Sequence, residues 1–238
     1  TTASGNGAHA EGYNTTASNQ NAHAEGNYTI ASGSDSHSEG YSTIASGGYS
    51  HAEGASTTAS GHYSHAEGRQ TSAIGDYSHA EGKDTTTLAD YSHAEGRSSF
   101  TTGLHSHAEG YLTTSSGDYA HSEGESTQAK GRASHAEGSN TIASGYTSHS
   151  EGFYTTARAN YSHTEGYYTV ATGAGHAEGY YTTAQGNGSH TEGSGTTATA
   201  IYSHAGGNTS VAGGSWSFVH GSGSTASSAG TIVLGDGI

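Results

Sequence analysis

The stretch Ser50-His51-Ala52-Glu53-Gly54 decides the fold, because close copies of it return along almost the whole chain. The first copy is Ala8-His9-Ala10-Glu11-Gly12, and histidines follow at intervals of fourteen residues from His9 to His163. One residue is missing around Gly173-Ala174-Gly175-His176, after which the interval returns. Fourteen of these histidines are followed two residues later by glutamate. A period this strict indicates a repeat architecture in which each unit stacks on its neighbours.

One repeat unit reads Thr-Thr/Ile-Ala-Ser-Gly-x-Tyr-Ser-His-Ala-Glu-Gly-x-x and divides into two similar halves of seven residues. In each half, Thr or Ser, Ala and Gly occupy positions one, three and five, with larger side chains between them. This alternation is typical of β-strands, and we expect the small residues to line a narrow interior. Each unit is therefore predicted to be one turn of an all-β, parallel β-solenoid, with about seventeen turns stacked ~4.8 Å apart.

The composition of the chain excludes several classes of protein. With a net charge of −15 over 238 residues, it has no basic patch for a nucleic acid partner. No apolar run is long enough to cross a membrane, so no membrane insertion is expected in this segment. Hydrophobic residues make up only 29%, and an interior of Ala, Ser and Gly buries little apolar area against the entropy of ordering the backbone. We therefore expect obligate association with further copies of the chain.

The repeat resembles a known family at two stretches in particular. Thr71-Ser72-Ala73-Ile74-Gly75-Asp76-Tyr77-Ser78-His79-Ala80-Glu81-Gly82 is similar to the repeat of YadA-type heads of trimeric autotransporter adhesins, also described as Hep/Hag-like repeats. Ser116-Gly117-Asp118-Tyr119-Ala120-His121-Ser122-Glu123-Gly124 matches the same frame. The Ser-His-Ala-Glu-Gly copies also resemble repeats of phage and prophage fibre proteins. The resemblance implies a left-handed parallel β-roll that associates as a parallel homotrimer.

The resemblance also implies a role for the repeated His and Glu, which we call the His/Glu ladder. The family carries Val and Ile at these positions and turns them toward the trimer axis, so three chains here would present stacked His and Glu to one another. In that arrangement a polar network would set the register between chains. The residues predicted for this axial ladder are His51, Glu53, His65, Glu67, His79, Glu81, His93, Glu95, His135 and Glu137.

Two other interpretations of the ladder stay open at this point. The His/Glu face could lie in solvent, and the oligomer face would then come from large residues of the other half: Ile30, Ile44, Ile74, Leu88, Phe100, Ile142 and Val170. The ladder could also bind metal ions, since both residue types are competent ligands. Regular repetition fits a structural ladder better than a tuned site, and the spacing matches no zinc motif. We therefore assign no metal site and no cofactor.

Aromatic and threonine rows offer further candidate surfaces. A cluster continuous over three turns is the best candidate for contact with a protein or glycan receptor: Phe153, Tyr154, Tyr167, Tyr168, Tyr180 and Tyr181. An ice-binding or other surface-binding solenoid is the alternative suggested by the threonines. However, the regular Thr column shares the inward face with Ala and Gly, which disfavours a flat outward array.

These observations predict a structural and adhesive protein rather than an enzyme. Every ladder histidine has the same surroundings, whereas catalysis needs one site that differs from the rest. We expect residues 1–206 to form regular turns and residues 207–238 to form irregular terminal turns leading to the next fibre segment. The function predicted is a rigid shaft or head of an extracellular trimeric fibre, on a bacterial cell surface or on a virion as a phage tail fibre.

Overall fold

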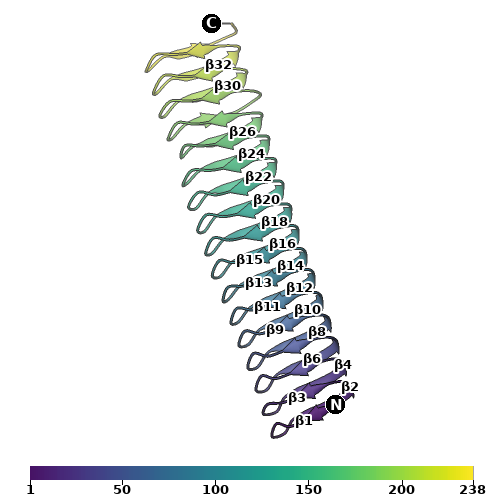
Figure 1. Ribbon diagram of the computed structural model, residues 1–238. Helices are drawn as coiled ribbons and strands as arrows, with labels where there is room; N and C mark the ends of the chain where they lie inside the picture. The colour runs from purple at the N-terminus through teal and green to yellow at the C-terminus, as the bar shows by residue number, and fades with distance from the viewer. Residues whose placement is uncertain (238) are drawn as a thin grey trace. The chain divides into compact units, whose positions relative to one another are not determined.

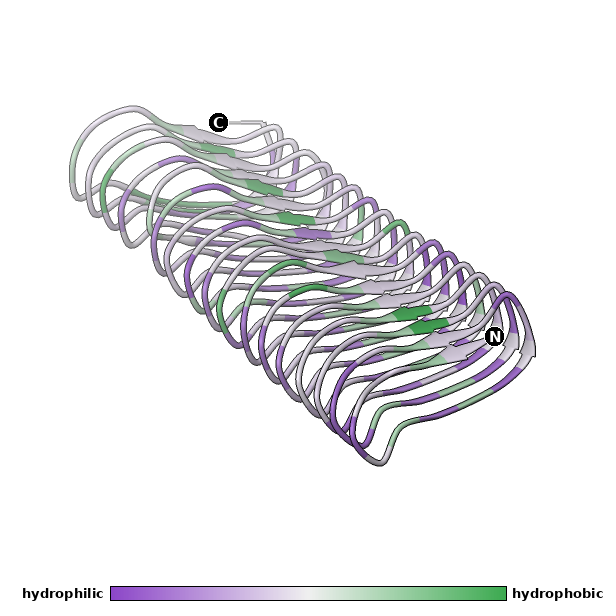
Figure 2. Ribbon diagram, turned by 60° about the horizontal axis from the view of Figure 1, so that its bottom comes forward, coloured by the Kyte–Doolittle hydropathy of each residue, from purple (hydrophilic) through white to green (hydrophobic). Residues whose placement is uncertain are grey.

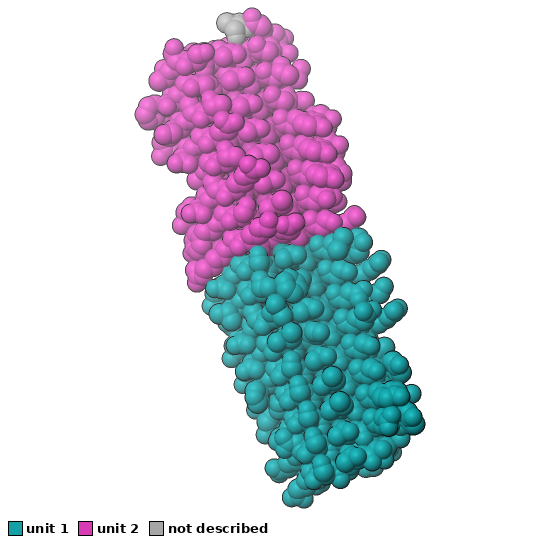
Figure 3. Space-filling model, in the orientation of Figure 1, with its two compact units in different colours: residues 1–119 teal, residues 120–238 magenta. Residues whose placement is uncertain are grey.

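The computed structural model describes residues 1–237, and in that range every regular element is a β-strand. Two compact units divide the chain, Thr1–Tyr119 and Ala120–Ile238 (Figure 3). In both units longer and shorter strands alternate along successive coils (Figure 1). Each coil contains one of each kind, so the sequence half Ser-His-Ala-Glu-Gly forms the long strand and the half Thr-x-Ala-Ser-Gly forms the short one.

In the first unit the long strands each begin at a repeat histidine. They are β2 (His9–Tyr13), β4 (His23–Asn27), β6 (His37–Tyr41), β8 (His51–Ala55), β10 (His65–Arg69), β12 (His79–Lys83), β14 (His93–Arg97) and β16 (His107–Tyr111). The short strands are β1 (Thr2–Ala3), β3 (Thr16–Ala17), β5 (Ile30–Ala31), β7 (Ile44–Ala45), β9 (Thr58–Ala59), β11 (Ser72–Ala73), β13 (Thr86–Thr87), β15 (Phe100–Thr101) and β17 (Thr114–Ser115).

In the second unit the same alternation continues, with a few departures in length. The strands of the His-containing half are β18 (His121–Glu125), β20 (His135–Ser139), β22 (His149–Phe153), β24 (His163–Tyr167), β26 (His176–Tyr180), β28 (His190–Thr191), β30 (His204–Asn208), β32 (Phe218–Ser222) and β34 (Ile232–Leu234). The others are β19 (Gln128–Ala129), β21 (Ile142–Ala143), β23 (Thr156–Ala157), β25 (Val170–Ala171), β27 (Thr183–Ala184), β29 (Thr197–Ala198), β31 (Val211–Ala212) and β33 (Thr225–Ala226).

Strands pair in parallel with the equivalent strand of the next coil. His65 of β10 lies opposite His51 of β8 and His79 of β12, and the alanines and glutamates of these strands pair in the same register. The short strands follow the same rule, as in the pairing of β11 with β9 and β13. The predicted parallel β-solenoid with turns of about fourteen residues is therefore confirmed.

The coil with one residue fewer keeps this register. His163 of β24 lies opposite His176 of β26, although the two are thirteen residues apart. The shortened corner is closed by a backbone hydrogen bond of 2.7 Å from the Gly175 amide to the Gly173 carbonyl. Because the deletion falls in a corner, the alternation of inward and outward side chains along the strands is preserved.

The interior consists of small side chains, as predicted. Ala66 and Ala73 are fully buried, as is Thr71 at the first position of its half. Figure 2 shows short hydrophobic stretches repeated from coil to coil among hydrophilic ones. Buried serines close the corners; Ser64 Oγ, for example, donates a 2.7 Å hydrogen bond to the Gly61 carbonyl. The interior is therefore held by backbone ladders and local hydroxyl bonds as much as by apolar burial.

The predicted position of glycine is confirmed in one half and wrong in the other. Gly61, in the Thr-x-Ala-Ser-Gly half, is buried, whereas Gly68, in the Ser-His-Ala-Glu-Gly half, is exposed. Gly68 has a φ of +106°, and a Cβ there would lie 2.1 Å from the carbonyl oxygen of Gly82. Glycine is needed there because the left-handed backbone and the close approach of the next coil leave no room for a side chain.

Residues 207–238 were expected to form irregular terminal turns, and this division at residue 206 stays a prediction. Strands β31 and β33 of this stretch still pair in parallel in the regular register, as Val211 with Thr225. The His/Glu pattern changes there, since Phe218 and His220 stand where earlier coils carry His and Glu.

Candidate functional site

The ladder histidines form regular stacks on one face of the long strands. In the first unit the rings of His51, His65 and His79 lie 4.8–4.9 Å apart between centroids, with planes within 4–5° of parallel. In the second unit the rings of His135 and His149 stack at 4.8 Å. This spacing equals the strand separation in a sheet, so the stack is imposed by the exact register of the coils.

Most ladder histidines also lie beside the glutamate two residues later, whereas His163 and His190 contact the glutamate of the preceding coil. Nε2 of His65 is 3.5 Å from Oε2 of Glu67, and the corresponding distance is 3.5 Å for His135 and Glu137. These distances are longer than a normal hydrogen bond of about 2.7–3.2 Å. The structure brings the ten predicted ladder residues together as five pairs: His51/Glu53, His65/Glu67, His79/Glu81, His93/Glu95 and His135/Glu137.

The ladder is half-buried in a single chain, and it is chemically incomplete there. The side chains of His65 and Glu67 are 36% and 40% exposed. Nevertheless the Nε2 atoms of His51, His65 and His79 are shielded from solvent and have no hydrogen-bond partner. Burying a polar atom without a partner is costly, so this face is suited to receiving a further group. The placement of the ladder at a trimer axis stays a prediction.

Burial lowers the pKa of several ladder histidines. Desolvation is the main cause for His65, His93 and His135; the charge of an adjacent ladder histidine lowers the pKa further, and the neighbouring glutamates act in the opposite direction. The lowered pKa favours the neutral form of the imidazole in these three residues. In these residues the effect of burial on the pKa exceeds the opposing attraction of the carboxylates.

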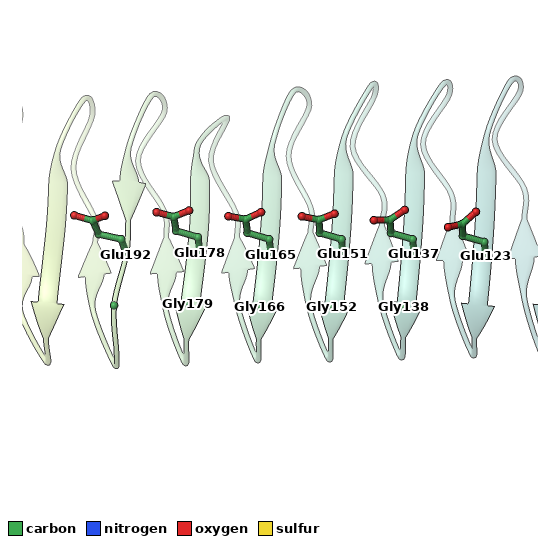
Figure 4. A pocket seen from close by; sticks show the side chains of 11 residues that line it. Glu123, Glu137, Gly138, Glu151, Gly152, Glu165, Gly166, Glu178, Gly179 and Glu192 are labelled. Carbon is green, nitrogen blue, oxygen red and sulfur yellow. The ribbon is translucent and has the colours of Figure 1, made fainter.

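In the second unit the glutamates line a shallow groove of about 700 Å³. Figure 4 shows the carboxylates in a single row along successive strands, above a row of glycines. The lining residues are Glu123, Glu137, Gly138, Glu151, Gly152, Glu165, Gly166, Glu178, Gly179, Glu192 and Gly193. Hydrogen bonds with Glu137 and Glu165 raise the pKa of Glu151 to about 7, and a hydrogen bond with Glu165 raises the pKa of Glu178. Repulsion from the charges of Glu137 and Glu165 also raises the pKa of Glu151, so closely spaced carboxylates in this row favour its protonated form.

The six predicted contact aromatics form two adjoining stacks. Phe153, Tyr167 and Tyr180 make one stack, with centroids 5.2 and 5.0 Å apart. The second stack places Tyr168 4.8 Å from Tyr154 and 4.9 Å from Tyr181. Each ring covers a face of its neighbour, so the edges, the hydroxyl groups and the faces at the two ends of the stacks are available to a ligand. The predicted cluster is a continuous aromatic surface, and its contact with a receptor stays a prediction.

A further aromatic column lies in the first unit, at the position where Tyr recurs before Ser-His. The rings of Tyr63, Tyr77 and Tyr91 stack at 4.9–5.0 Å, and His105 continues the column at 4.8 Å from Tyr91. These residues hold φ values of 55–57°, a left-handed conformation that is costly for aromatic residues. The signal available was the column of Tyr before Ser-His, in which His105 replaces Tyr.

The alternative oligomer face is also located by the structure. Ile30, Ile44, Ile74 and Leu88 are 36–45% exposed, and Phe100, Ile142 and Val170 are partly buried. These residues lie in or beside the short strands, but polar residues such as Thr58 and Ser72 occupy equivalent positions in other coils. The apolar surface on this side is therefore discontinuous.

The threonine column lies inside the solenoid. Thr15, Thr57 and Thr71 are 0–1% exposed. A buried column cannot meet an ice lattice, which argues against the ice-binding alternative. Residues 1–237 contain no helix with the length and apolar character that a membrane span requires.

Comparison with protein families finds a similar repeat over three segments of the chain. The family model described as the YadA head domain repeat matches residues 20–36, 66–86 and 177–200. No curated protein matches the chain.

Proposed function

The chain carries YadA head domain repeats wound into a parallel β-solenoid, and from this premise we propose that it is an adhesin-type segment of a surface fibre. Three chains would associate in parallel, each a left-handed coil, with the His/Glu ladder at their common axis. Its location would be extracellular, at a cell surface. Its role would be mechanical and adhesive, without catalysis, because the ladder offers a repeated environment rather than one distinct reactive site.

The observation that carries the proposal is the unfinished His/Glu face. Nε2 atoms such as those of His79 and His93 are shielded from solvent but lack a hydrogen-bond partner. A second and third chain would bring donors and acceptors to these atoms. The fully buried interior is dominated by Ala, Thr and Ser, with few larger apolar side chains, so burial of a further surface would add the stabilisation that a single chain lacks.

The cluster of six aromatic residues in the second unit is the proposed receptor-contact surface. Tyr180 and Tyr181 are each 50% exposed, and their hydroxyl-bearing rings combine apolar area with hydrogen-bonding capacity. The phage-fibre version of this function rests on the sequence resemblance alone.

Native mass by light scattering at pH 7.5 tests the assembly. We expect about 72 kDa, three times the 23.9 kDa of one chain. Three charge substitutions locate the interface: Glu81→Arg on the ladder, Ser72→Arg on the short-strand face and Gln70→Arg at an exposed corner. We expect Glu81→Arg alone to reduce the mass, with circular dichroism showing that each variant keeps its strands.

A monomeric parent chain would refute the trimer. If Ser72→Arg dissociated the assembly and Glu81→Arg did not, the interface would lie on the short-strand face and the axial ladder would be wrong.

A further inference from the structure

The His/Glu ladder contains repeated groups of three metal-ligand atoms. Two successive histidines and the glutamate between them bring their ligand atoms within 4.8 Å of one another. In the first unit three such groups share no residue: His23/Glu25/His37, His51/Glu53/His65 and His79/Glu81/His93. We propose that the ladder binds divalent first-row transition-metal ions, of which Zn²⁺ is the probe, with about one ion per two turns.

The His–Glu distance within one turn suits an ion better than a direct contact. Nε2 and Oε2 are 3.5 Å apart in His51/Glu53 and in His79/Glu81. Two ligands of a tetrahedral zinc, each at about 2.0–2.1 Å, lie roughly 3.3–3.4 Å from one another. The pair is too long for a good hydrogen bond but matches one edge of a zinc tetrahedron.

The third ligand comes from the next turn. The ligand atoms of His51, Glu53 and His65 lie within 4.8 Å of one another, so the separation between two of these atoms must shorten by at most about 1.4 Å to reach a tetrahedral edge of roughly 3.4 Å. Rotation about the terminal torsion of the side chain can supply this movement, because that torsion is broad in histidine. A water molecule would complete the fourth position.

The state of the ligands favours binding. The Nε2 atoms of His51, His65, His79 and His93 are shielded from water and have no hydrogen-bond partner, so an ion would compete with no existing bond. Imidazole with carboxylate is a ligand set that suits zinc and copper better than calcium or magnesium. The stacked carboxylates and the net charge of −15 would also attract cations.

Repulsion between ions sets the occupancy. Ions in adjacent turns would lie only ~4.8 Å apart, whereas ions in alternate turns would be about twice as far apart. Alternation also lets each ion use two histidines. This inference concerns one chain's own ladder and goes beyond the proposed fibre function, since it requires no trimer.

Equilibrium dialysis of the full chain against 100 µM free Zn²⁺, without a histidine tag and with metal quantified by mass spectrometry, tests the inference. We expect several ions per chain. A quadruple variant removes four successive carboxylates: Glu53→Gln/Glu67→Gln/Glu81→Gln/Glu95→Gln. It should bind about two zinc ions fewer per chain than the parent. Stacked glutamines preserve the column, because amide ladders are compatible with parallel strands.

Two matched controls stand outside the ladder: His62→Asn and Glu125→Gln, both at exposed positions. Each should bind as many ions as the parent chain. Fewer than one ion per chain, an unchanged content in the quadruple variant, or an equal loss in the controls would overturn the inference.

Light scattering on the same samples in EDTA separates this inference from the proposed function. A trimer that takes up no zinc would leave the fibre proposal standing and overturn metal binding. A monomer that binds several ions through the ladder would support metal binding and refute the trimer.

Discussion

Replacing Gly207 by alanine should destabilise the solenoid because two separate costs fall on one residue. Gly207 has a φ of +92°, and a Cβ built there lies 2.1 Å from the carbonyl oxygen of Gly221. A left-handed backbone costs an L-residue about 1–2 kcal/mol. The neighbouring coil must also move away by roughly 1.3 Å before ordinary contact is restored, and overpacking of this kind costs about 1–3 kcal/mol. We expect a loss of about 2–5 kcal/mol in the free energy of unfolding.

Two nearby glycines separate these costs. Gly223 has a φ of +65° but no atom within 4 Å of an added Cβ, so Gly223→Ala should lose only the backbone part, about 1–2 kcal/mol. At Gly213 the nearest atom is 3.6 Å away, and Gly213→Ala should change the free energy of unfolding by less than about 0.5 kcal/mol.

Denaturant unfolding at one fixed protein concentration, followed by circular dichroism, measures all three variants. A fixed concentration is needed because association contributes to apparent stability. The slope of the transition should stay unchanged, which shows that the same structure unfolds. If Gly207→Ala proved no more destabilising than Gly223→Ala, the close approach between coils would not be the constraint on this glycine column.

Two further predictions concern the interior and the ladder. Thr71→Val should stabilise the chain by about 1 kcal/mol, because the Thr71 hydroxyl is buried without a hydrogen-bond partner. Thr43→Val should instead destabilise it by about 1–3 kcal/mol, because the Thr43 hydroxyl forms a 2.7 Å hydrogen bond with a buried serine. Thermal unfolding of the two variants and the parent chain measures both effects. Burial and the neighbouring ladder histidine lower the pKa of His149. In EDTA, the unfolded chain therefore binds a proton at this residue at a higher pH than the folded chain does, so stability falls as the pH drops below 6.5. Hydrogen bonds to adjacent glutamates raise the pKa of Glu151 from 4.5 to about 7, which has the opposite effect on stability. The stabilisation that this carboxyl group contributes is lost as the pH rises from 4.5 to about 7. Glu151→Gln should therefore make the unfolding midpoint rise more steeply between pH 5 and pH 7, and an unchanged slope would show that this carboxyl group holds no proton in the folded chain.

Much of the candidate site followed from the repeat period. Because His51 and His65 are separated by one full turn, a parallel solenoid must place them opposite one another, and the same holds for Glu53 and Glu67. The aromatic cluster was predictable for the same reason, since Tyr167 and Tyr180 occupy equivalent corners of successive turns. With a regular period, residues one repeat apart in the sequence become neighbours in adjacent turns of the structure.

Other features depended on backbone conformations that residue type does not reveal. Tyr77 and Tyr91 sit in a left-handed conformation that is usually adopted by Gly, Asn or Asp, so their residue type did not predict the backbone conformation of the two-residue corner. The place of His105 in the tyrosine stack, in contrast, follows from the period, because it stands fourteen residues after Tyr91.

The sequence by itself determined the parallel β-solenoid, the register of its coils and the columns of His, Glu and Tyr, because strict periodicity and two-residue alternation leave one consistent way to stack the turns. Only the tertiary structure decided that Gly68 faces outward, that Nε2 atoms such as those of His51, His65 and His79 are shielded without hydrogen-bond partners, and that burial outweighs the carboxylates in setting the pKa of His65. These properties depend on the distance between neighbouring coils and on how far each side chain is removed from water, and such distances exist only once the chain is wound.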